Sequence, residues 1–359
     1  MKKNLLISLA VLVLSGTLSA QQYEFRTVVD NPSTSLKDQA RTGTCWCFAT
    51  ISFLESELMR MGREPIDLSE MFIVRNVYKA RYFDNYLRTG KGNLGPGSVS
   101  HTATKAIARY GLIPDAAYPG IQYDAPGHNH SELQGYINAI SQVPARMKKM
   151  SPESDELLDA LLDIYLGKVP QTFLYNGKEY TPKSFARYLG LNMDDYIEIT
   201  SFTHHPFYTR IPVEIPDNWE HELYYNVPLD EYMAIADHAL NNGFTIAWDG
   251  TLTKNFSQQD GVATEPSPDP SADEVNVTQD IRQEWFETFS TVDDHLMHVT
   301  GIAKDQDGVT YYITKNSWGE SGKYKGFMYM SENYFRARCI AYMVHKDAIP
   351  KDIRKKLGL

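Results

Sequence analysis

The chain has 359 residues, of which 42% are hydrophobic and 22% are charged, and its formal net charge is −10 at pH 7. This length allows one large or two small domains with a substantial core. The acidic balance offers no electrostatic attraction to nucleic acid or anionic lipid, so we expect neither as a partner. Three cysteines, Cys45, Cys47 and Cys339, are too few for the disulfide framework of a small secreted scaffold.

Residues 1–20 have the layout of a secretory signal peptide. Two lysines precede an apolar run at 5–14, and small residues follow up to Ala20. The apolar run is too short to hold the chain in a bilayer, and no cysteine follows Ala20 to carry a lipid, so we expect no membrane anchor. We predict cleavage after Ala20, a single mature domain at 21–359, and secretion into the periplasm or the extracellular space.

The stretch from Gln39 to Phe48 predicts a nucleophile in the first turn of a helix. The helix is indicated by apolar residues at a spacing of three and four, ended by Gly62: Phe48, Ile51, Leu54, Leu58 and Met61. Cys45 therefore lies where unpaired backbone N–H groups and the helix dipole favour an anion, which should lower the pKa of its thiol. The competing interpretation is that Cys45 is a small buried hydrophobic residue.

Gln39 lies six residues before Cys45 and Gly43 allows a tight turn between them. The Gln39 side-chain amide can therefore return toward the sulfur. Together with the Cys45 backbone N–H it would form a two-donor oxyanion hole.

The rest of the chain divides into a helical part and a strand-rich part. Helices are expected at 69–82, at 101–110 and through most of 133–191, and again at 229–241. Strands are expected at 196–200, 245–248, 295–302, 311–314 and 326–330. The stretch 255–280, rich in Ser, Asp, Pro and Glu, predicts a mobile acidic loop.

No metal site is predicted. His204 and His205 are adjacent, but no carboxylate or third histidine stands at a useful spacing, so a solvated or hydrogen-bonded pair in a turn is expected. Cys45 and Cys47 have no second cysteine pair with zinc-like spacing, and residues two apart on a helix point to different sides. Cys47 is therefore assigned to the core.

The second candidate segment contains His295, His298 and the motif Asn316-Ser317-Trp318-Gly319. Residues three apart on a strand point to opposite faces, so only one of the two histidines can reach Cys45. His298 is then a packed or solvent-facing strand residue.

The order Gln39, Cys45-Trp46, His295, Asn316 and Trp318 resembles the papain superfamily of cysteine peptidases. In that family a glycine follows the catalytic histidine by six residues, which fits His295 with Gly301 and not His298. The resemblance implies that the Asn316 side chain accepts a hydrogen bond from the His295 nitrogen facing away from the sulfur, and that Trp318 keeps water off that bond.

Other features resemble the bleomycin hydrolase and aminopeptidase C branch. About 250 residues separate Cys45 from His295, against about 130 to 150 in simple papains, and the short segment before Gln39 has no room for the usual pro-segment. Gly97 and Ser98 stand where papain-like enzymes pair with the substrate backbone. The branch also implies a possible homo-oligomer, and a C-terminal arm in the cleft that is about fifteen residues longer than this chain, ~50 Å if extended.

The expected fold is therefore α+β: a two-lobed papain-like cysteine peptidase fold with a helical insertion. The helical lobe would span mainly 39–190 and carry Cys45, and the β-rich lobe mainly 196–345 and carry His295 and Asn316. The expected activity is hydrolysis of peptide bonds in a peptide or protein substrate through a thioester, without a metal or organic cofactor. An aminopeptidase leads, while an open-cleft endopeptidase, a transamidase and an inactive peptide-binding module stay open.

Overall fold

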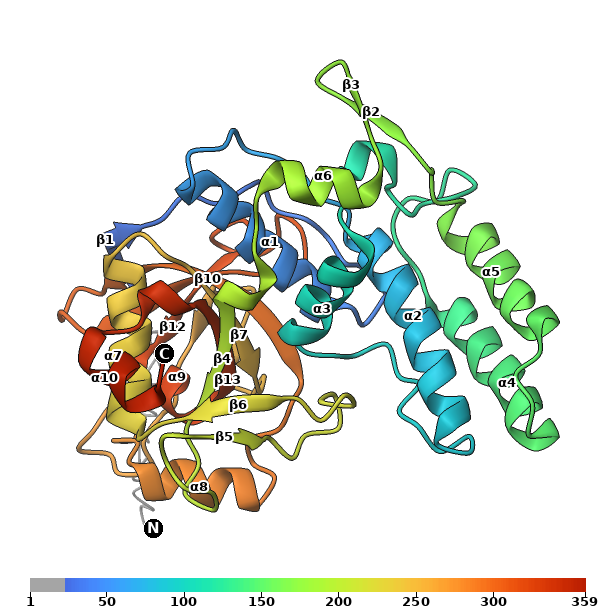
Figure 1. Ribbon diagram of the computed structural model, residues 1–359. Helices are drawn as coiled ribbons and strands as arrows, with labels where there is room; N and C mark the ends of the chain where they lie inside the picture. The colour runs from blue at the N-terminus through green and yellow to red at the C-terminus, as the bar shows by residue number, and fades with distance from the viewer. Residues whose placement is uncertain (1–22) are drawn as a thin grey trace, which may run out of the picture.

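The computed structural model describes residues 23–359, so the predicted signal peptide at 1–20 lies outside the described residues. The helices formed by residues 45–189 lie on one side of the molecule, and a large sheet with the later helices lies on the other (Figure 1). Within residues 23–359, none of the helices combines the length and the apolar character needed to cross a membrane.

The helical side is built from the chain between Cys45 and the first strands of the main sheet. Its helices are α1 (Cys45–Arg60), α2 (Glu70–Leu87), α3 (Ser100–Tyr110), α4 (Ser131–Met147), α5 (Pro152–Leu166) and α6 (Pro182–Leu189), with short 3-10 turns at Asp115–Ala117 and Met193–Asp195. Figure 1 shows α4 and α5 side by side at the outer edge, next to α2. The prediction of a helical insertion is confirmed for these elements.

Helix α1 is more deeply buried than its sequence indicates. The predicted apolar face is buried from Phe48 to Leu58, but Met61 is 46% exposed. Every other residue between Cys45 and Leu58 is buried as well, including Glu55 and Glu57. These two carboxylates are paired: Glu55 accepts from Lys37 and the Leu68 backbone, and Glu57 pairs with Arg60. Buried charges persist only when they are paired and hydrogen-bonded. These partners therefore allow the two carboxylates of α1 to be buried.

The expectation of helix throughout 133–191 needs one correction. A hairpin of β2 (Phe173–Tyr175) and β3 (Lys178–Tyr180) separates α5 from α6. Asn176 and Gly177 between these strands both have positive φ, 48° and 76°. Such a pair at an Asn-Gly turn matches the right-handed twist of two-residue hairpins.

The β-rich side is one 11-stranded sheet with the order β5-β6-β4-β13-β7-β10-β11-β12-β9-β8, with β1 also paired to β10. The strands are β1 (Arg26–Asp30), β4 (Tyr196–Thr200), β5 (Thr209–Pro212), β6 (Leu223–Asn226), β7 (Ile246–Gly250), β8 (Phe256–Ser257), β9 (Val262–Ala263), β10 (His295–Lys304), β11 (Thr310–Lys315), β12 (Phe327–Ser331) and β13 (Cys339–His345). The remaining helices are α7 (Leu229–Asn241), α8 (Gln279–Glu287), α9 (Glu332–Arg338) and α10 (Lys351–Leu357), with a 3-10 turn at Lys346–Ala348.

The two faces of this sheet pack against different helices. Ala247 and Leu296 belong to the core that contains α1, whereas Trp248 and Met297 belong to the core that contains α7. This alternation follows the two-residue period of a strand. Helix α10 lies on the α7 side, so residues 351–359 pack on the face of the sheet opposite α1 (Figure 1).

The stretch 255–280 is not simply the acidic loop predicted from its composition. Its first part contributes β8 and β9, and β9 pairs with β12. Glu265 is buried and receives two hydrogen bonds from Arg338, at 2.7 and 3.0 Å. The sheet edge and this ion pair hold a segment that has little apolar content of its own.

Candidate active site

Cys45 is the first residue of α1 and is only 8% exposed. Gly43 shapes the turn before it, because its φ of +65° is a left-handed conformation and Pro96 leaves little room for a side chain. The backbone N–H groups of Trp46 and Leu296 both donate toward the Cys45 sulfur. The sulfur thus lies between the start of α1 and the start of β10.

The pKa of the Cys45 thiol differs from the sequence-based expectation. Burial raises it to about 12, and the negative charges of Asp249 and Asp293 add to that increase. The backbone N–H donors act in the opposite direction but are the smaller effect. At neutral pH the sulfur therefore keeps its proton until an acceptor takes it.

His295 is the first residue of β10 and is buried beside Asn316 and Trp318. Its Nε2 lies 2.8 Å from Asn316 Oδ1, and its ring stacks on Trp318 with centroids 4.9 Å apart. Because Asn316 Oδ1 is an acceptor, Nε2 carries the proton and Nδ1 is the basic nitrogen. Burial lowers the pKa of His295 to about 4, which favours the neutral ring.

Asn316 is itself held in place. The Ser317 backbone N–H donates to its Oδ1 at 2.8 Å, and its Nδ2 donates to Gln258 Oε1 at 2.7 Å. Gln258 was not singled out from the sequence, where it lies in the stretch expected to be an acidic loop.

Gln39 and Ser317 meet across the two halves of the chain. The Gln39 backbone N–H donates to Ser317 O at 2.9 Å, and the Ser317 hydroxyl donates to Gln39 Oε1 at 2.6 Å. This second bond fixes the amide with its oxygen toward Ser317, so Nε2 is the end left to donate to a substrate oxygen. Sequence analysis missed this role of Ser317, although the residue lies within the motif that it identified.

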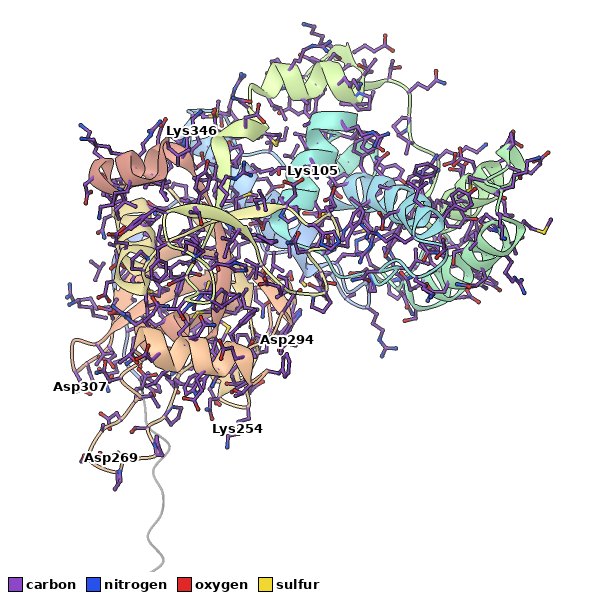
Figure 2. The ribbon with its side chains drawn as sticks, turned by 60° about the horizontal axis from the view of Figure 1, so that its bottom comes forward. Lys105, Lys254, Asp269, Asp294, Asp307 and Lys346 are labelled. Carbon is purple, nitrogen blue, oxygen red and sulfur yellow. The ribbon has the colours of Figure 1, made fainter. Side chains whose placement is uncertain are left out.

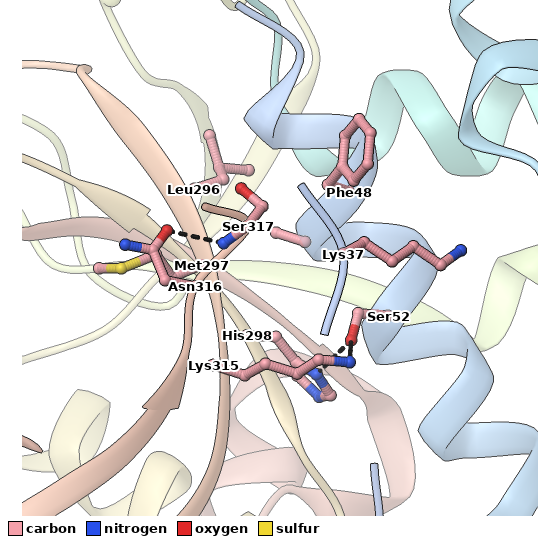
Figure 3. A pocket seen from close by; sticks show the side chains of 10 residues that line it. Lys37, Phe48, Ser52, Leu296, Met297, His298, Lys315, Asn316 and Ser317 are labelled. Atoms are coloured by element: carbon pink, nitrogen blue, oxygen red, sulfur yellow. Dashed lines mark hydrogen bonds between the residues drawn. The ribbon is translucent and has the colours of Figure 1, made fainter. Parts of the chain in front are cut away.

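His298 occupies a different environment from His295. It is buried, and its Nδ1 lies 2.9 Å from Ser52 Oγ on α1, while Lys315 Nζ donates to the same hydroxyl at 2.7 Å (Figure 3). These groups line a small cavity together with Lys37 and Asn316. His298 is thus packed rather than solvent-facing, the two alternatives that the sequence left open, and its bond to Ser52 joins β10 to α1.

The remaining predicted site residues are Trp46 on α1 and the pair Gly97 and Ser98 in the loop before α3. The Trp46 indole donates to Pro96 O at 2.9 Å, and the Gly97 carbonyl accepts from Arg81. Ser98 is buried and bonds to Trp219 Nε1 at 3.0 Å. Pairing of Gly97 and Ser98 with a substrate stays a prediction.

His204 and His205 have a partner that their spacing does not reveal. Glu214 lies 3.0 Å from His204 Nε2 and 2.7 Å from His205 Nε2. No carboxylate was expected from the sequence spacing, but the segment after β5 brings Glu214 to this pair. The expected hydrogen-bonded pair of histidines is observed, with both rings bonded to one carboxylate.

Comparisons with known proteins agree with this arrangement. Residues 8–358 match the Peptidase C1-like family. The chain is 23% identical over 366 residues to aminopeptidase C of Lactobacillus helveticus, covering 89% of this chain and 81% of the relative. It is 22% identical over 383 residues to mitochondrial cysteine proteinase 1 of Saccharomyces cerevisiae (strain YJM789), covering 92% and 79%.

A solved structure supports the fold. The pepW structure from Lactobacillus rhamnosis HN001 superimposes with a TM-score of 0.74 at 18% identity, covering 93% of this chain and 84% of that one. The α+β fold with α1 packed against the sheet is thus papain-like, as the sequence predicted. With its motifs brought together in this fold and matched over nearly its full length, the chain belongs to the Peptidase C1-like family.

Proposed function

We propose that the protein is a cysteine aminopeptidase that removes the N-terminal residue of a peptide through a thioester on Cys45. Two relatives that it resembles are named aminopeptidases, C of Lactobacillus helveticus and G of Lactobacillus delbrueckii subsp. lactis. The chemistry is supported by the convergence of Cys45, His295, Asn316 and Gln39 described above.

Before substrate binds, the proton shared by Cys45 and His295 is on the Cys45 sulfur. The pKa of Cys45 is raised to about 12 and that of His295 is lowered to about 4, both because burial disfavours an isolated charge. Transfer of the proton from Sγ to Nδ1 gives a thiolate and an imidazolium that attract each other. This transfer accompanies attack on the carbonyl carbon, and the imidazolium then protonates the leaving amine.

The oxygen of the tetrahedral intermediate needs hydrogen-bond donors that are already in place. Gln39 Nε2, aimed by Ser317, and the Cys45 backbone N–H at the start of α1 are those donors. After the amine leaves, His295 takes a proton from a water molecule, and the water oxygen attacks the thioester. The acid then leaves, and the His295 imidazolium returns the proton to the Cys45 sulfur.

The observation that favours an aminopeptidase over an endopeptidase is that the loop containing Asp217 covers Gly97. Asp217 lies against the Gly97 Cα and leaves no room for a side chain there. The same loop is fastened to the helical side: Asn93 Nδ2 donates to Pro216 O at 2.7 Å, and Trp219 lies under the Arg81 guanidinium at 5.4 Å. A peptide extended beyond the acylating residue would meet this loop where papain-like enzymes bind substrate backbone.

The test compares a peptide with a free N-terminus and the same peptide N-acetylated, with products read by mass. Stepwise loss of N-terminal residues from the free peptide alone is the expected result. Equal cleavage of both peptides at internal bonds would reject the aminopeptidase and leave an endopeptidase. Alkylation of Cys45, located by mass, should abolish either activity.

Two further properties belong to the same proposal. Export with cleavage after Ala20 is supported by the residue pattern at 1–20, and is checked by the N-terminal sequence of the protein in the periplasmic fraction and the medium. A homo-oligomer is supported by the branch resemblance alone, and light scattering coupled to gel filtration measures it.

A further inference from the structure

Asp249 lies on the face of the sheet that meets α1, beside the Cys45 sulfur. Its neighbour across β7 and β10 is Leu296, whose backbone N–H contacts that sulfur. Ala247, two residues earlier on the same strand, belongs to the core under α1. Because side chains two apart share one face, the Asp249 carboxylate points to the same side as Leu296.

This carboxylate is buried without a donor. Asp249 is 4% exposed, and neither of its oxygens has a hydrogen-bond partner among the donor groups of residues 23–359. The strongest charge acting on it is that of another carboxyl, Asp293, which also has a buried oxygen without a partner. The Tyr224 hydroxyl is also buried without a hydrogen-bond partner, and burial, together with the charges of both acids, raises its pKa.

The charges nearest this group are acidic. The largest charges acting on Asp249 come from Asp293, Glu198 and Asp217. Glu198 is already paired with His101 at 2.6 Å, and Asp217 is acted on by the Arg81 charge, so Asp293 is the acid that matters most for Asp249. Burial and this mutual repulsion raise the pKa of Asp249 well above its usual range and that of Asp293 to about 7. The two carboxyls therefore share a proton near neutral pH, and a bound cation would replace it.

Because Asp249 lies near the Cys45 sulfur, the cation expected beside it is one carried by the substrate near its reacting carbonyl group. In a substrate the α-nitrogen is two bonds from the carbonyl carbon that Cys45 attacks. We infer that Asp249 and Asp293 bind the free α-ammonium group of the substrate, with the Tyr224 hydroxyl as a third acceptor. This inference rests on the proposed aminopeptidase function and names the groups that enforce it.

Asp249 and Asp293 would thus restrict cleavage to the N-terminal residue of a peptide. An ammonium group brings three N–H donors, which match two carboxyls and one hydroxyl. An acylated nitrogen carries no charge and brings a carbonyl group toward the carboxylates. Discrimination against it is the expected behaviour of a site whose buried polar groups would be left unpaired.

The experiment uses three arylamide substrates: alanyl, propionyl and N-acetylalanyl. The propionyl compound lacks only the amine, so it separates the effect of charge from that of bulk. The variants are Asp249→Asn and Asp293→Asn, with Asp269→Asn as a control for charge, because Asp269 lies on an exposed loop (Figure 2). Titration of Cys45 with an alkylating agent normalises each rate to folded, reactive enzyme.

The wild type should favour the alanyl over the propionyl substrate, and Asp249→Asn should reduce this ratio of kcat/KM by about 10- to 100-fold, the range of hydrogen bonds to charged groups. Asp269→Asn should leave the ratio unchanged. An unchanged ratio in both Asp249→Asn and Asp293→Asn would overturn the inference while the aminopeptidase stands. A wild type that shows no preference for the free amine would instead reject the proposed function.

Discussion

Replacement of Ser317 by alanine removes the hydroxyl that orients the Gln39 amide but leaves Gln39, the proposed oxyanion donor, in place. The Ser317 hydroxyl donates to Gln39 Oε1 at 2.6 Å and so fixes which end of the amide faces the substrate. Its backbone N–H, which bonds to Asn316, is retained in the alanine variant. The substitution therefore frees the amide without disturbing the His295–Asn316 pair.

The expected loss follows from the energy of one bond. A neutral hydrogen bond contributes about 0.5–1.5 kcal/mol, so Ser317→Ala should lower kcat by about 2- to 12-fold. Removal of the donor itself, in Gln39→Ala, should cost about 10²- to 10³-fold. KM should change little in both variants, because the bond to the oxygen strengthens only as the tetrahedral intermediate forms.

A double-mutant cycle decides whether Ser317 acts through Gln39. In the Gln39→Ala background, Ser317→Ala should have no further effect on kcat, since the group that it positions is absent. Ser321→Ala is the matched control, because the Ser321 hydroxyl has no hydrogen-bond partner among the described residues. Equal factors for Ser317→Ala in both backgrounds would refute the positioning role.

Three other predictions concern buried groups. His295→Ala should lower acylation by several orders of magnitude, as loss of a triad member does, whereas His298→Ala should mainly lower the thermal midpoint; single-turnover rates and calorimetry separate the two, and the reverse pattern would contradict the assignment. Asp249 has a raised pKa in the folded state, so folding binds a proton and wild-type stability falls as pH rises above about 4. Asp249→Asn should therefore gain stability relative to wild type between pH 4 and 7 in urea titrations, and a constant difference would contradict this reasoning. Arg338→Met should destabilise the fold by about 3–5 kcal/mol by leaving Glu265 buried and unpaired; recovery of most of the loss in Arg338→Met with Glu265→Gln is the expected result, and no recovery would count against it.

The local structure of the two candidate motifs could be predicted because each motif is local in sequence. Cys45 follows a turn and opens a helix within a few residues, and Asn316 is followed directly by Trp318, which stacks on His295. The choice of His295 over His298 rested on the two-residue period of a strand and a glycine spacing, and it stays a prediction. Ser52, which engages His298 in the structure, lies 246 residues away in the chain.

The groups that were missed depend on strand register and on burial. Asp249 lies near the Cys45 sulfur because β7 pairs with β10 so that Asp249 is opposite Leu296, whose backbone N–H donates toward that sulfur. Gln258 reaches Asn316 because the segment around it joins the edge of the sheet. Neither pairing leaves a periodic signal in the sequence, and composition suggested a loop for the second.

The direction of the Cys45 pKa shift shows how burial overrides a local rule. A helix N-terminus lowers a thiol pKa by providing N–H donors, but those donors act at the surface of a group that remains solvated. Here the sulfur is almost completely removed from water, and the cost of an isolated charge exceeds the gain from the donors. That degree of burial depends on how α1 packs against the sheet, which has no local signal in the residues around Cys45.

The same physical condition governs both halves of the proposed site. Cys45 with His295, and Asp249 with Asp293, are pairs in which burial keeps a proton where solvent would release it. In each pair the substrate supplies what offsets the penalty on charge: its carbonyl carbon takes up the thiolate, and its ammonium group compensates the carboxylates. A substrate with a free N-terminus satisfies both pairs at once, whereas an acylated one leaves the carboxyl pair uncompensated beside a sulfur that must become negative. The acids near Cys45 would then suppress the thiolate in the empty enzyme and release it when the amine binds.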